Sequence, residues 1–476
     1  MADVVIIGAG VIGCAIARQL SRRSLECIVI EKNAEPAFGT TKANSGIVHA
    51  GHQSDPNTMK GRFDAKACLL FDELLDELHF SFKRIGELVI AQAPEDAEKL
   101  DKMREISRIK GVTVEMWDAA TLREKEPSLS HEITQALHAP MAGVINPYEF
   151  TYALIENAMA NGVQLRTHTA VTAIEKTATG LAVITENTVT GQMSRIETRF
   201  VVNAAGLYAD KINNLVNEPY FTINPRKGQE FLLDRHITGQ PKRLIFPLPT
   251  KESKGILLIP TYDGTLMIGP TAENTDFDDF ATTPEGQAKI YASVQKICPN
   301  LGPMQPIAQF AGLRAVASTD DFIIEPTATK GFINVAGIQS PGLTASPEIA
   351  RYVDEILTQE GLKTSPNPHF NPIRNHAPRF SLVPLEKQLE MVAENPNYAD
   401  IICRCEVVPR AEIENALNEG ATTLDGIKLR TRAGMGRCQG GFCSPRVLQM
   451  LADHLHCPLT AIHKNNDGSW IATPHK

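Results

Sequence analysis

The sequence predicts an α/β protein in which a Rossmann-like nucleotide-binding domain carries an inserted antiparallel-sheet domain and is followed by a small helical domain. The chain opens with an apolar strand, a glycine-rich turn and a helix. Apolar strand-like runs and helical segments then alternate to about residue 360, which is typical of α/β domains. Four of the nine cysteines crowd into residues 403–443, beyond a proline-rich stretch. A length of 476 residues suits two or three such domains.

The N-terminal turn has the spacing of a dinucleotide-binding site. A strand leads into Gly8, Gly10 and Gly13 and then into a helix. In this pattern the first glycine permits the tight turn, the second lets the backbone approach a pyrophosphate, and the third lets helix and strand pack closely. The helix N-terminus presents N–H groups to the phosphates. Glu31 ends the next strand, where a carboxylate accepts hydrogen bonds from ribose hydroxyls. The turn alone does not separate FAD from NAD.

The rest of the first 360 residues alternates strands and helices. The inserted sheet is expected from residues of about 75–150 and 220–325, where alternating strands and Pro/Gly turns are frequent in the second portion. A helix is expected to open at Asp55, with Pro56 in its first turn, and to run to about residue 78. Further strands are expected at 27–31, 200–204, 255–260, 265–269 and 332–336.

Two later segments favour FAD. Residues 200–210 form a strand that ends in a glycine turn beside the nucleotide, and residues 331–353 give a strand, a Gly/Pro loop and a helix. A helix that starts near Thr344 would direct its N–H groups at an anion such as the N1–O2 edge of a reduced flavin.

A linker and a second domain follow. Residues 361–380 contain four prolines, so residues 361–397 are expected to be a Pro-rich linker with a connecting helix. Residues 398–476 then form a separate domain that holds Cys403-x-Cys405 and Cys438-x4-Cys443. Four thiolates suit a [2Fe-2S] cluster or a tetrahedral zinc ion, although a one-residue gap crowds two sulfurs on one metal. Nearby glycines would free N–H groups for the cluster sulfurs, and nearby arginines would offset its charge, dock an acidic partner or form a solvated basic face; these are Gly434, Gly436, Gly440, Gly441, Arg430, Arg432 and Arg437.

Five ordered blocks carry a family resemblance. GAGVIGCAIA, TTKANSGIVHAGH, VVNAAGLYADKI, FAGLRA and AGIQSPGLT resemble the successive FAD-contacting segments of the D-amino-acid-oxidase-like flavoprotein superfamily, in its glycerol-3-phosphate and L-2-hydroxyglutarate dehydrogenase branch. The resemblance covers residues 1 to about 360 and implies an FAD-dependent oxidoreductase domain. Besides the glycine turn and Glu31, it implies FAD contacts at Thr41, Asn44, Ser45, Val171, Gly206, Gly342, Leu343 and Thr344.

The segment RTRAGMGRCQGGFCSPR is similar to the bacterioferritin-associated-ferredoxin-like [2Fe-2S] domain, as found at the C-terminal end of the flavoprotein subunits of anaerobic glycerol-3-phosphate dehydrogenases. This resemblance favours the [2Fe-2S] cluster, with Cys403, Cys405, Cys438 and Cys443 as its ligands. It also implies that the electrons pass on to a second flavoprotein or to an iron-sulfur subunit.

The reacting residues are assigned by the same resemblance. Oxidation of a secondary alcohol needs a base for the hydroxyl proton and cations for the anionic end of the substrate. The resemblance implies His49 as the residue beside the flavin, with His52 as a weaker alternative. It implies Arg314 as the arginine that binds the substrate anion, and Lys227 as a further basic residue.

Together these features imply a dehydrogenase that oxidises sn-glycerol 3-phosphate to dihydroxyacetone phosphate and passes the electrons through the [2Fe-2S] cluster to a partner redox subunit. Three alternatives remain: an L-2-hydroxyglutarate or other 2-hydroxy-acid dehydrogenase, an opine or imino-acid dehydrogenase, and an electron-transfer adaptor. A net charge of -8 provides no general attraction for nucleic acid or an anionic membrane. With no basic leader and no segment suited to a bilayer, we expect a cytoplasmic protein that reaches a membrane only through a partner.

Overall fold

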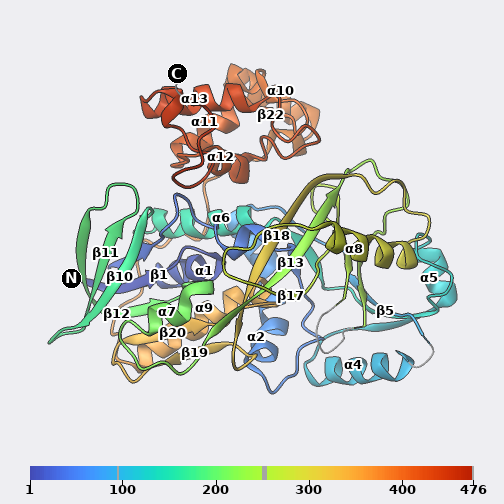
Figure 1. Cartoon of the computed structure of the whole chain (residues 1–476), viewed down its shortest axis with the longest axis horizontal. Helices are drawn as coiled ribbons and strands as arrows, with labels where there is room; N and C mark the ends of the chain where they lie inside the picture. Colours follow the sequence, from blue (N-terminus) through green and yellow to red (C-terminus); the bar gives the residue numbers. More distant parts are fainter. Residues whose placement is uncertain (94–95, 249–254, 474–476) are drawn as a thin grey trace.

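Two large sheets lie beside each other in the computed structural model, which describes residues 1–93, 96–248 and 255–473, and a small helical domain covers one side of them (Figure 1). This arrangement confirms the predicted fold class. The predicted boundaries after residues 360 and 397 stay predictions, and the last three residues of the predicted C-terminal domain lie outside the described residues. Among the described residues, no helix has the length and apolar character needed to cross a membrane.

The first sheet is parallel at its centre. Strand β1 (Ala2–Ile7) pairs in parallel with β2 (Cys27–Ile30) and with β12 (Met193–Asn203), and β12 pairs in parallel with β20 (Phe332–Ala336). Strands β2 and β20 are buried throughout, as expected where helices cover both faces of a parallel sheet. The outer strands are β9 (Gln164–Arg166), β10 (Thr169–Lys176), β11 (Leu181–Asn187) and β19 (Ile323–Pro326).

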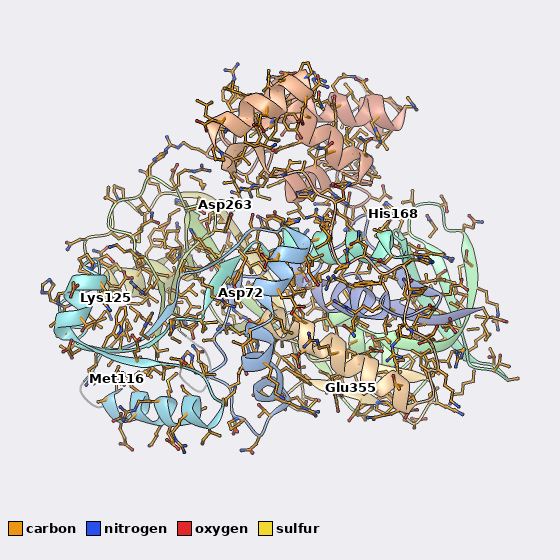
Figure 2. The ribbon with its side chains drawn as sticks, turned by 180° about the vertical axis from the view of Figure 1, so that it is seen from behind. Asp72, Met116, Lys125, His168, Asp263 and Glu355 are labelled. Carbon is orange, nitrogen blue, oxygen red and sulfur yellow. The ribbon has the colours of Figure 1, made fainter. Side chains whose placement is uncertain are left out.

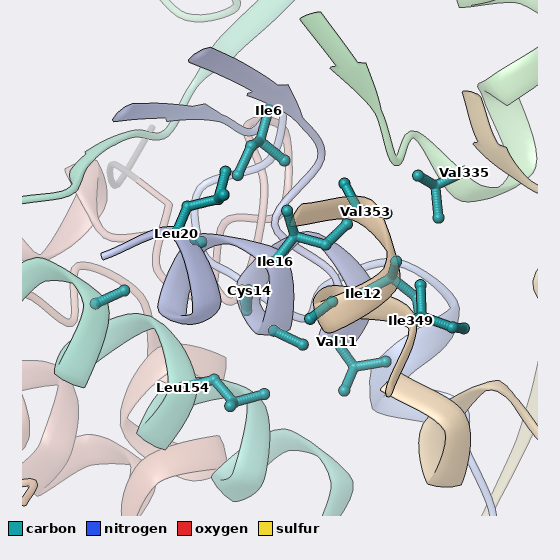
Figure 3. Packing of buried hydrophobic residues seen from close by; sticks show 14 of the residues in the cluster. Ile6, Val11, Ile12, Cys14, Ile16, Leu20, Leu154, Val335, Ile349 and Val353 are labelled. Atoms are coloured by element: carbon teal, nitrogen blue, oxygen red, sulfur yellow. The ribbon is translucent and has the colours of Figure 1, made fainter. Parts of the chain in front are cut away.

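Helix α1 (Val11–Leu20) lies against this sheet and packs between α6 (Pro147–Ala160) and α9 (Gly342–Gln359). Its apolar side chains meet those of the neighbouring elements in one continuous core (Figure 3). Ile16 and Leu20 are fully buried there. Because α1 begins directly after the glycine turn, this packing fixes the position of the turn.

The second sheet forms from two separated stretches of the chain. It is antiparallel except that β14 (Leu244–Pro247) runs parallel to β5 (Glu87–Ala91). Its longest pairing joins β13 (Ile223–Leu233) to β18 (Pro306–Ala317). Its other strands are β6 (Glu115–Asp118), β7 (Gln135–Ala139), β15 (Leu257–Pro260), β16 (Leu266–Gly269) and β17 (Glu273–Asn274), and its helices are α4 (Ala97–Ile109), α5 (Ala119–Lys125) and α8 (Pro284–Ile297). A small sheet of β3 (Ile47–Val48), β8 (Gly143–Ile145) and β4 (Phe82–Arg84) lies between the two large ones.

The helix expected from Asp55 to residue 78 is two helices that start later, α2 (Met59–Cys68) and α3 (Phe71–Leu78). The Asp55 carboxylate accepts a hydrogen bond from the Asn57 N–H (2.9 Å) and so closes a turn ahead of the helix. Thr58 is the N-cap, because its hydroxyl accepts from the Gly61 N–H (3.1 Å). The prediction of a single helix capped by Asp55 was therefore wrong.

The C-terminal domain consists mainly of α11 (Arg410–Asn418), α12 (Leu424–Thr431) and α13 (Ser444–Leu455), with a short hairpin of β21 (Ile401–Cys403) and β22 (Val408–Pro409). Helix α10 (Leu385–Glu394) precedes it, within residues 361–397. In Figure 1 the C-terminal domain lies above α6, and α12 is the helix in contact with α6. The prolines of the linker prevent regular structure between residues 363 and 379, apart from an isolated bridge at Pro366.

Candidate functional site

A cavity of about 780 Å³ lies where the carboxyl ends of β1 and β2 meet one face of β13 and β18, within the usual range of about 300–1,000 Å³ for ligand sites. It brings together residues that are far apart in the sequence. Of the predicted site residues, those lining it are Gly8, Gly10, Glu31, Thr41, Asn44, Ser45, His49, Val171, Gly206, Arg314, Gly342 and Leu343. Gly13, Thr344 and Lys227 do not line it.

The glycine turn has the backbone that its sequence requires. Gly8 has a φ of +105°, and a Cβ there would lie 2.6 Å from the Ala204 carbonyl oxygen. A Cβ at Gly13 would collide with the Gly8 carbonyl oxygen, so Gly13 serves helix–strand packing rather than lining the cavity. Between them, the Val11 N–H donates to Thr41 Oγ1 (3.1 Å). Gly10, Val11 and Ile12 line the cavity, so the start of α1 faces it, as a phosphate site needs.

Glu31 lies at the end of β2 with its carboxylate held in place. One oxygen accepts from the Ala9 N–H (2.8 Å), and the other accepts from the Asn33 N–H (2.9 Å) and side-chain amide (2.6 Å). Burial raises the pKa of Glu31, and these hydrogen bonds lower it in part. A fixed carboxylate beside the glycine turn fits the ribose of a dinucleotide.

A group of two histidines and a glutamate lies beside another part of the cavity, and one of the histidines forms part of its wall. Glu87, at the start of β5, is fully buried, with an oxygen 2.9 Å from His52 Nδ1 and the other 3.8 Å from His49 Nδ1. Burial raises the pKa of Glu87, but the two histidines outweigh it and bring the pKa to about 2. His49 Nε2 lies 3.3 Å from Ser340 Oγ. His49 lines the cavity, whereas His52 is fully buried and does not.

Thr344 supports this segment from α9. Its hydroxyl accepts from the His49 N–H (3.0 Å) and donates to the Ile47 carbonyl (3.3 Å). The Thr344 side chain therefore holds the backbone of residues 47–49, and Gly342 and Leu343 at the start of α9 line the cavity. The FAD contact at Thr344 stays a prediction, and only the backbone of Thr344 is left to make it.

Alternation along β13 decides which of its side chains face the cavity. Arg226, Gly228 and Glu230 line it. Lys227 points to the other face, where its Nζ lies 2.6 Å from Asp279 and only 4% of the residue is exposed. The prediction of Lys227 as a catalytic-site cation was therefore wrong by one residue, because neighbouring strand residues point to opposite faces. Arg226 is the basic residue of β13 that lines the cavity.

Arg314 lies opposite Arg226 on the paired strand β18. Its guanidinium crosses Gly228 so closely that a Cβ there would lie 2.5 Å from Arg314 Nη2, and it donates to the Thr271 carbonyl (3.3 Å). Neither arginine makes an ion pair with any described residue. Burial lowers the pKa of Arg314, the Glu230 carboxylate opposes this in part, and Arg226 lowers the pKa further. Like charges facing each other across a sheet destabilise it, and a bound anion between the two arginines would offset this repulsion.

The four predicted cysteine ligands form two pairs. Cys405 Sγ and Cys438 Sγ are 3.6 Å apart, near the ~3.8 Å expected for two thiolates on one tetrahedral metal. Cys403 and Cys443 interact through a second hydrogen bond, which is the main cause that lowers the pKa of Cys403 to about 6. The pKa of Cys438 is also lowered, chiefly by a hydrogen bond from the Phe442 N–H. Two pairs suit the two irons of a [2Fe-2S] cluster, and the described residues contain no group of three or more His, Cys, Asp or Glu placed around a single ion.

The arginines near the cluster have a role that the sequence did not reveal. Arg430 lies 2.8 Å from Glu35 and stacks over the Tyr152 ring, so it joins the C-terminal domain to the nucleotide-binding domain. Arg432 lies 2.7 Å from Asp263, which Figure 2 shows on the side facing the C-terminal domain. Both arginines are buried. They therefore neither form a solvated face nor dock a partner.

The surface above the cluster is open by contrast. Cys405 is exposed. Phe442, which lies between Cys438 and Cys443 in the sequence, is 82% exposed. Arg404 and Arg437 are also exposed, and Arg437 pairs with Asp234 (2.7 Å). An exposed aromatic ring flanked by arginines is typical of protein-binding surfaces.

Comparison with known proteins assigns this geometry to a family. Residues 3–356 match the family model described as FAD dependent oxidoreductase, and residues 401–453 match the BFD-like [2Fe-2S] binding domain. The chain belongs to the FAD dependent oxidoreductase family and carries a [2Fe-2S] binding domain at its C-terminal side. The predicted cofactors, FAD and a [2Fe-2S] cluster, are confirmed, and the cavity and the paired cysteines fit them.

Three individual proteins are similar to this chain over most of its length. A glycerol 3-phosphate dehydrogenase from Caloramator mitchellensis is 45% identical over 99% of this chain and 98% of its own length. One subunit of the anaerobic glycerol-3-phosphate dehydrogenase of Escherichia coli (strain K12) is 24% identical over 94% of this chain and 88% of its own length. The solved structure of dithionite-reduced L-alpha-glycerophosphate oxidase from Mycoplasma pneumoniae with FAD bound is 28% identical, with a TM-score of 0.74 over 79% of this chain and 99% of that one.

Proposed function

We propose that this protein oxidises sn-glycerol 3-phosphate to dihydroxyacetone phosphate with FAD and passes the electrons through its [2Fe-2S] cluster to a partner redox protein. The observation that carries the proposal is the pair of facing arginines, Arg226 and Arg314, in a cavity that also contains the residues expected to contact FAD. A phosphate monoester carries the charge that two guanidinium groups can bind together. The 45% identical glycerol 3-phosphate dehydrogenase supports this substrate.

Each residue has a defined task in this proposal. Arg226 and Arg314 bind the phosphate, and His49 takes the proton of the substrate hydroxyl. Glu87 orients the His49 ring and, with its pKa near 2, stays ionised across the working pH range. FAD, when held by the residues around the glycine turn, would supply the acceptor for the hydride. The burial of Glu87 keeps its charge directed at the histidines rather than at water.

A panel of substrates tests the proposed function. Under anaerobic conditions, sn-glycerol 3-phosphate is expected to bleach the visible flavin absorbance of the holoenzyme in a single turnover. L-2-Hydroxyglutarate and opines are expected to reduce it far more slowly. Fast bleaching by a hydroxy acid or an opine, with none by glycerol 3-phosphate, would establish one of the alternative substrates, and no bleaching by any of them would favour the electron-transfer adaptor.

Substitution of Arg314 tests the anion site. Arg314→Ala is expected to lower kcat/KM for glycerol 3-phosphate by roughly 30- to 1,000-fold, mainly through KM, because a charge-assisted contact of about 2–4 kcal/mol is lost. FAD content should not change. Lys227→Ala is the matched control, since Lys227 lies near Arg314 in the same sheet but faces away from the cavity. Stopped-flow flavin reduction measures both, and equal losses in the two variants would contradict this assignment.

The electron acceptor is proposed to bind at the exposed surface of the C-terminal domain around Phe442. Electron transfer needs close approach to the cluster, and the exposed Cys405 marks its accessible side. Arg404 and Arg437 on this surface favour an acidic partner, a second flavoprotein or an iron-sulfur protein. Any association with a membrane would then run through that partner.

A further inference from the structure

Glu230 is a buried carboxyl group in the cavity with no task in the reaction described above. It lies on the same face of β13 as Arg226, and only 2% of the residue is exposed. Its Oε1 accepts a hydrogen bond from the Ser45 hydroxyl. Its Oε2 has no hydrogen-bond partner among the described residues. A buried carboxylate oxygen without a partner is costly, so this oxygen is available to a bound molecule.

The cavity face of β13 therefore has two chemically different ends. Arg226 and the guanidinium of Arg314, which crosses Gly228, form a cationic end. Glu230, two residues beyond Gly228, forms a carboxyl end beside Ser45. Two strand residues span roughly 6.6 Å, which is about the length of a three-carbon phosphate monoester.

We propose that Glu230 Oε2 and its immediate surroundings form a hydroxyl-binding subsite that takes the terminal hydroxymethyl group of the substrate, at the end opposite its phosphate. This subsite rests on the proposed function and specifies how that substrate is chosen. A substrate with carboxylates at both ends, such as 2-hydroxyglutarate, would bring a negative charge against Glu230. The subsite thus favours a phosphate monoester with a terminal hydroxyl over a dicarboxylate.

The protonation of Glu230 agrees with a hydroxyl ligand. Burial raises the pKa of Glu230 to about 7, although Ser45 and Arg314 oppose this. A hydroxyl group can donate to the ionised carboxylate and can accept from the protonated acid, so it satisfies Oε2 in both forms.

Two ligands that cannot be oxidised test the subsite by equilibrium binding. 3-Hydroxypropyl phosphate has the terminal hydroxyl and lacks the reacting one, whereas propyl phosphate lacks both. Titration of the holoenzyme, followed by the change in flavin absorbance, gives a Kd for each. In the wild type the terminal hydroxyl is expected to tighten binding about 10- to 100-fold, as for a hydrogen bond to a charged group. In Glu230→Gln this advantage should fall to about 3-fold or less.

Control variants distinguish a hydroxyl-binding role of Glu230 from its other roles. Lys227→Gln, on the opposite face of the same strand, should keep the wild-type ratio of the two Kd values, and Glu230→Asp, which withdraws the carboxyl by one methylene, should reduce it. An unchanged ratio in both Glu230 variants would overturn the subsite, and so would a loss of FAD without a change in the ratio, which would make Glu230 a flavin contact. Failure of the proposed function has a separate sign, which is that glycerol 3-phosphate does not reduce the flavin of the wild type.

Discussion

Replacing His49 by alanine is expected to slow reduction of the bound flavin by about 10²–10⁴-fold, the usual contribution of a positioned general base. His49 lines the cavity and its ring lies between the Glu87 carboxylate and Ser340. Alanine leaves the hydroxyl proton of the substrate without this acceptor. Stopped-flow absorbance under anaerobic conditions measures the rate, and the ratio of flavin to protein shows whether FAD is still bound.

His52 provides the matched control for this experiment. Its ring contacts the same Glu87 carboxylate (2.9 Å) but does not line the cavity. His52→Ala is expected to lower Tm, because it removes one partner of a buried charge, and to slow flavin reduction far less than His49→Ala. Equal losses in the two variants would show that both act through Glu87 alone. Loss of FAD from His49→Ala would make His49 a flavin-packing residue.

Replacing Cys438 by serine is expected to abolish electron delivery to a protein acceptor while sparing the reaction with substrate. Cys438 is paired with Cys405 and would supply one of the two cysteine ligands of one iron. Hydride transfer to FAD needs no cluster, so glycerol 3-phosphate should still bleach the flavin in one turnover. Steady-state reduction of cytochrome c, which is too large to enter the cavity, should collapse. A small dye such as phenazine methosulfate should retain much of its rate.

Cys457→Ser is the control, because Cys457 belongs to the same domain but to neither cysteine pair. It should keep its iron and its cytochrome c reductase activity. Iron and sulfide analysis must show about two irons in the wild type and their loss in Cys438→Ser. Normal cytochrome c reduction by a Cys438→Ser protein free of iron would show that the cluster has only a structural role.

Local sequence patterns predicted the nucleotide-binding part of the molecule. The glycine turn and the strand that ends near Glu31 depend on short-range spacing, and the structure shows both in the expected form. The contact between Cys405 and Cys438 joins two separate cysteine motifs, and only the folded chain shows it. The roles of the individual residues stay predictions. Lys227 failed because the family resemblance gave a basic position, but the face of β13 that meets the cavity depends on pairing with β18.

Other residues of the site were missed by sequence reasoning for a different reason. Glu87 and Glu230 are carboxylates within apolar strand-like runs, GELVI and GQEFLL, which is a signal for a buried functional group. Their partners His52 and Ser45 are far away in the sequence, so only the folded chain shows what they contact. Arg430 and Arg432 seemed to belong to the cluster for the same reason: their acidic partners Glu35 and Asp263 lie in the other domain.

These buried arginines determine how the iron-sulfur domain can move. The linker that precedes it is also held, since Arg374 is buried and lies 2.6 Å from Glu156 of α6. To swing away, the domain and its linker would have to separate several buried ion pairs at the same time, those of Arg430, Arg432 and Arg374. These pairs hold the domain against the nucleotide-binding domain. The acceptor proposed above must therefore come to a cluster in a fixed position, and a longer linker would bring no gain in the rate of electron transfer.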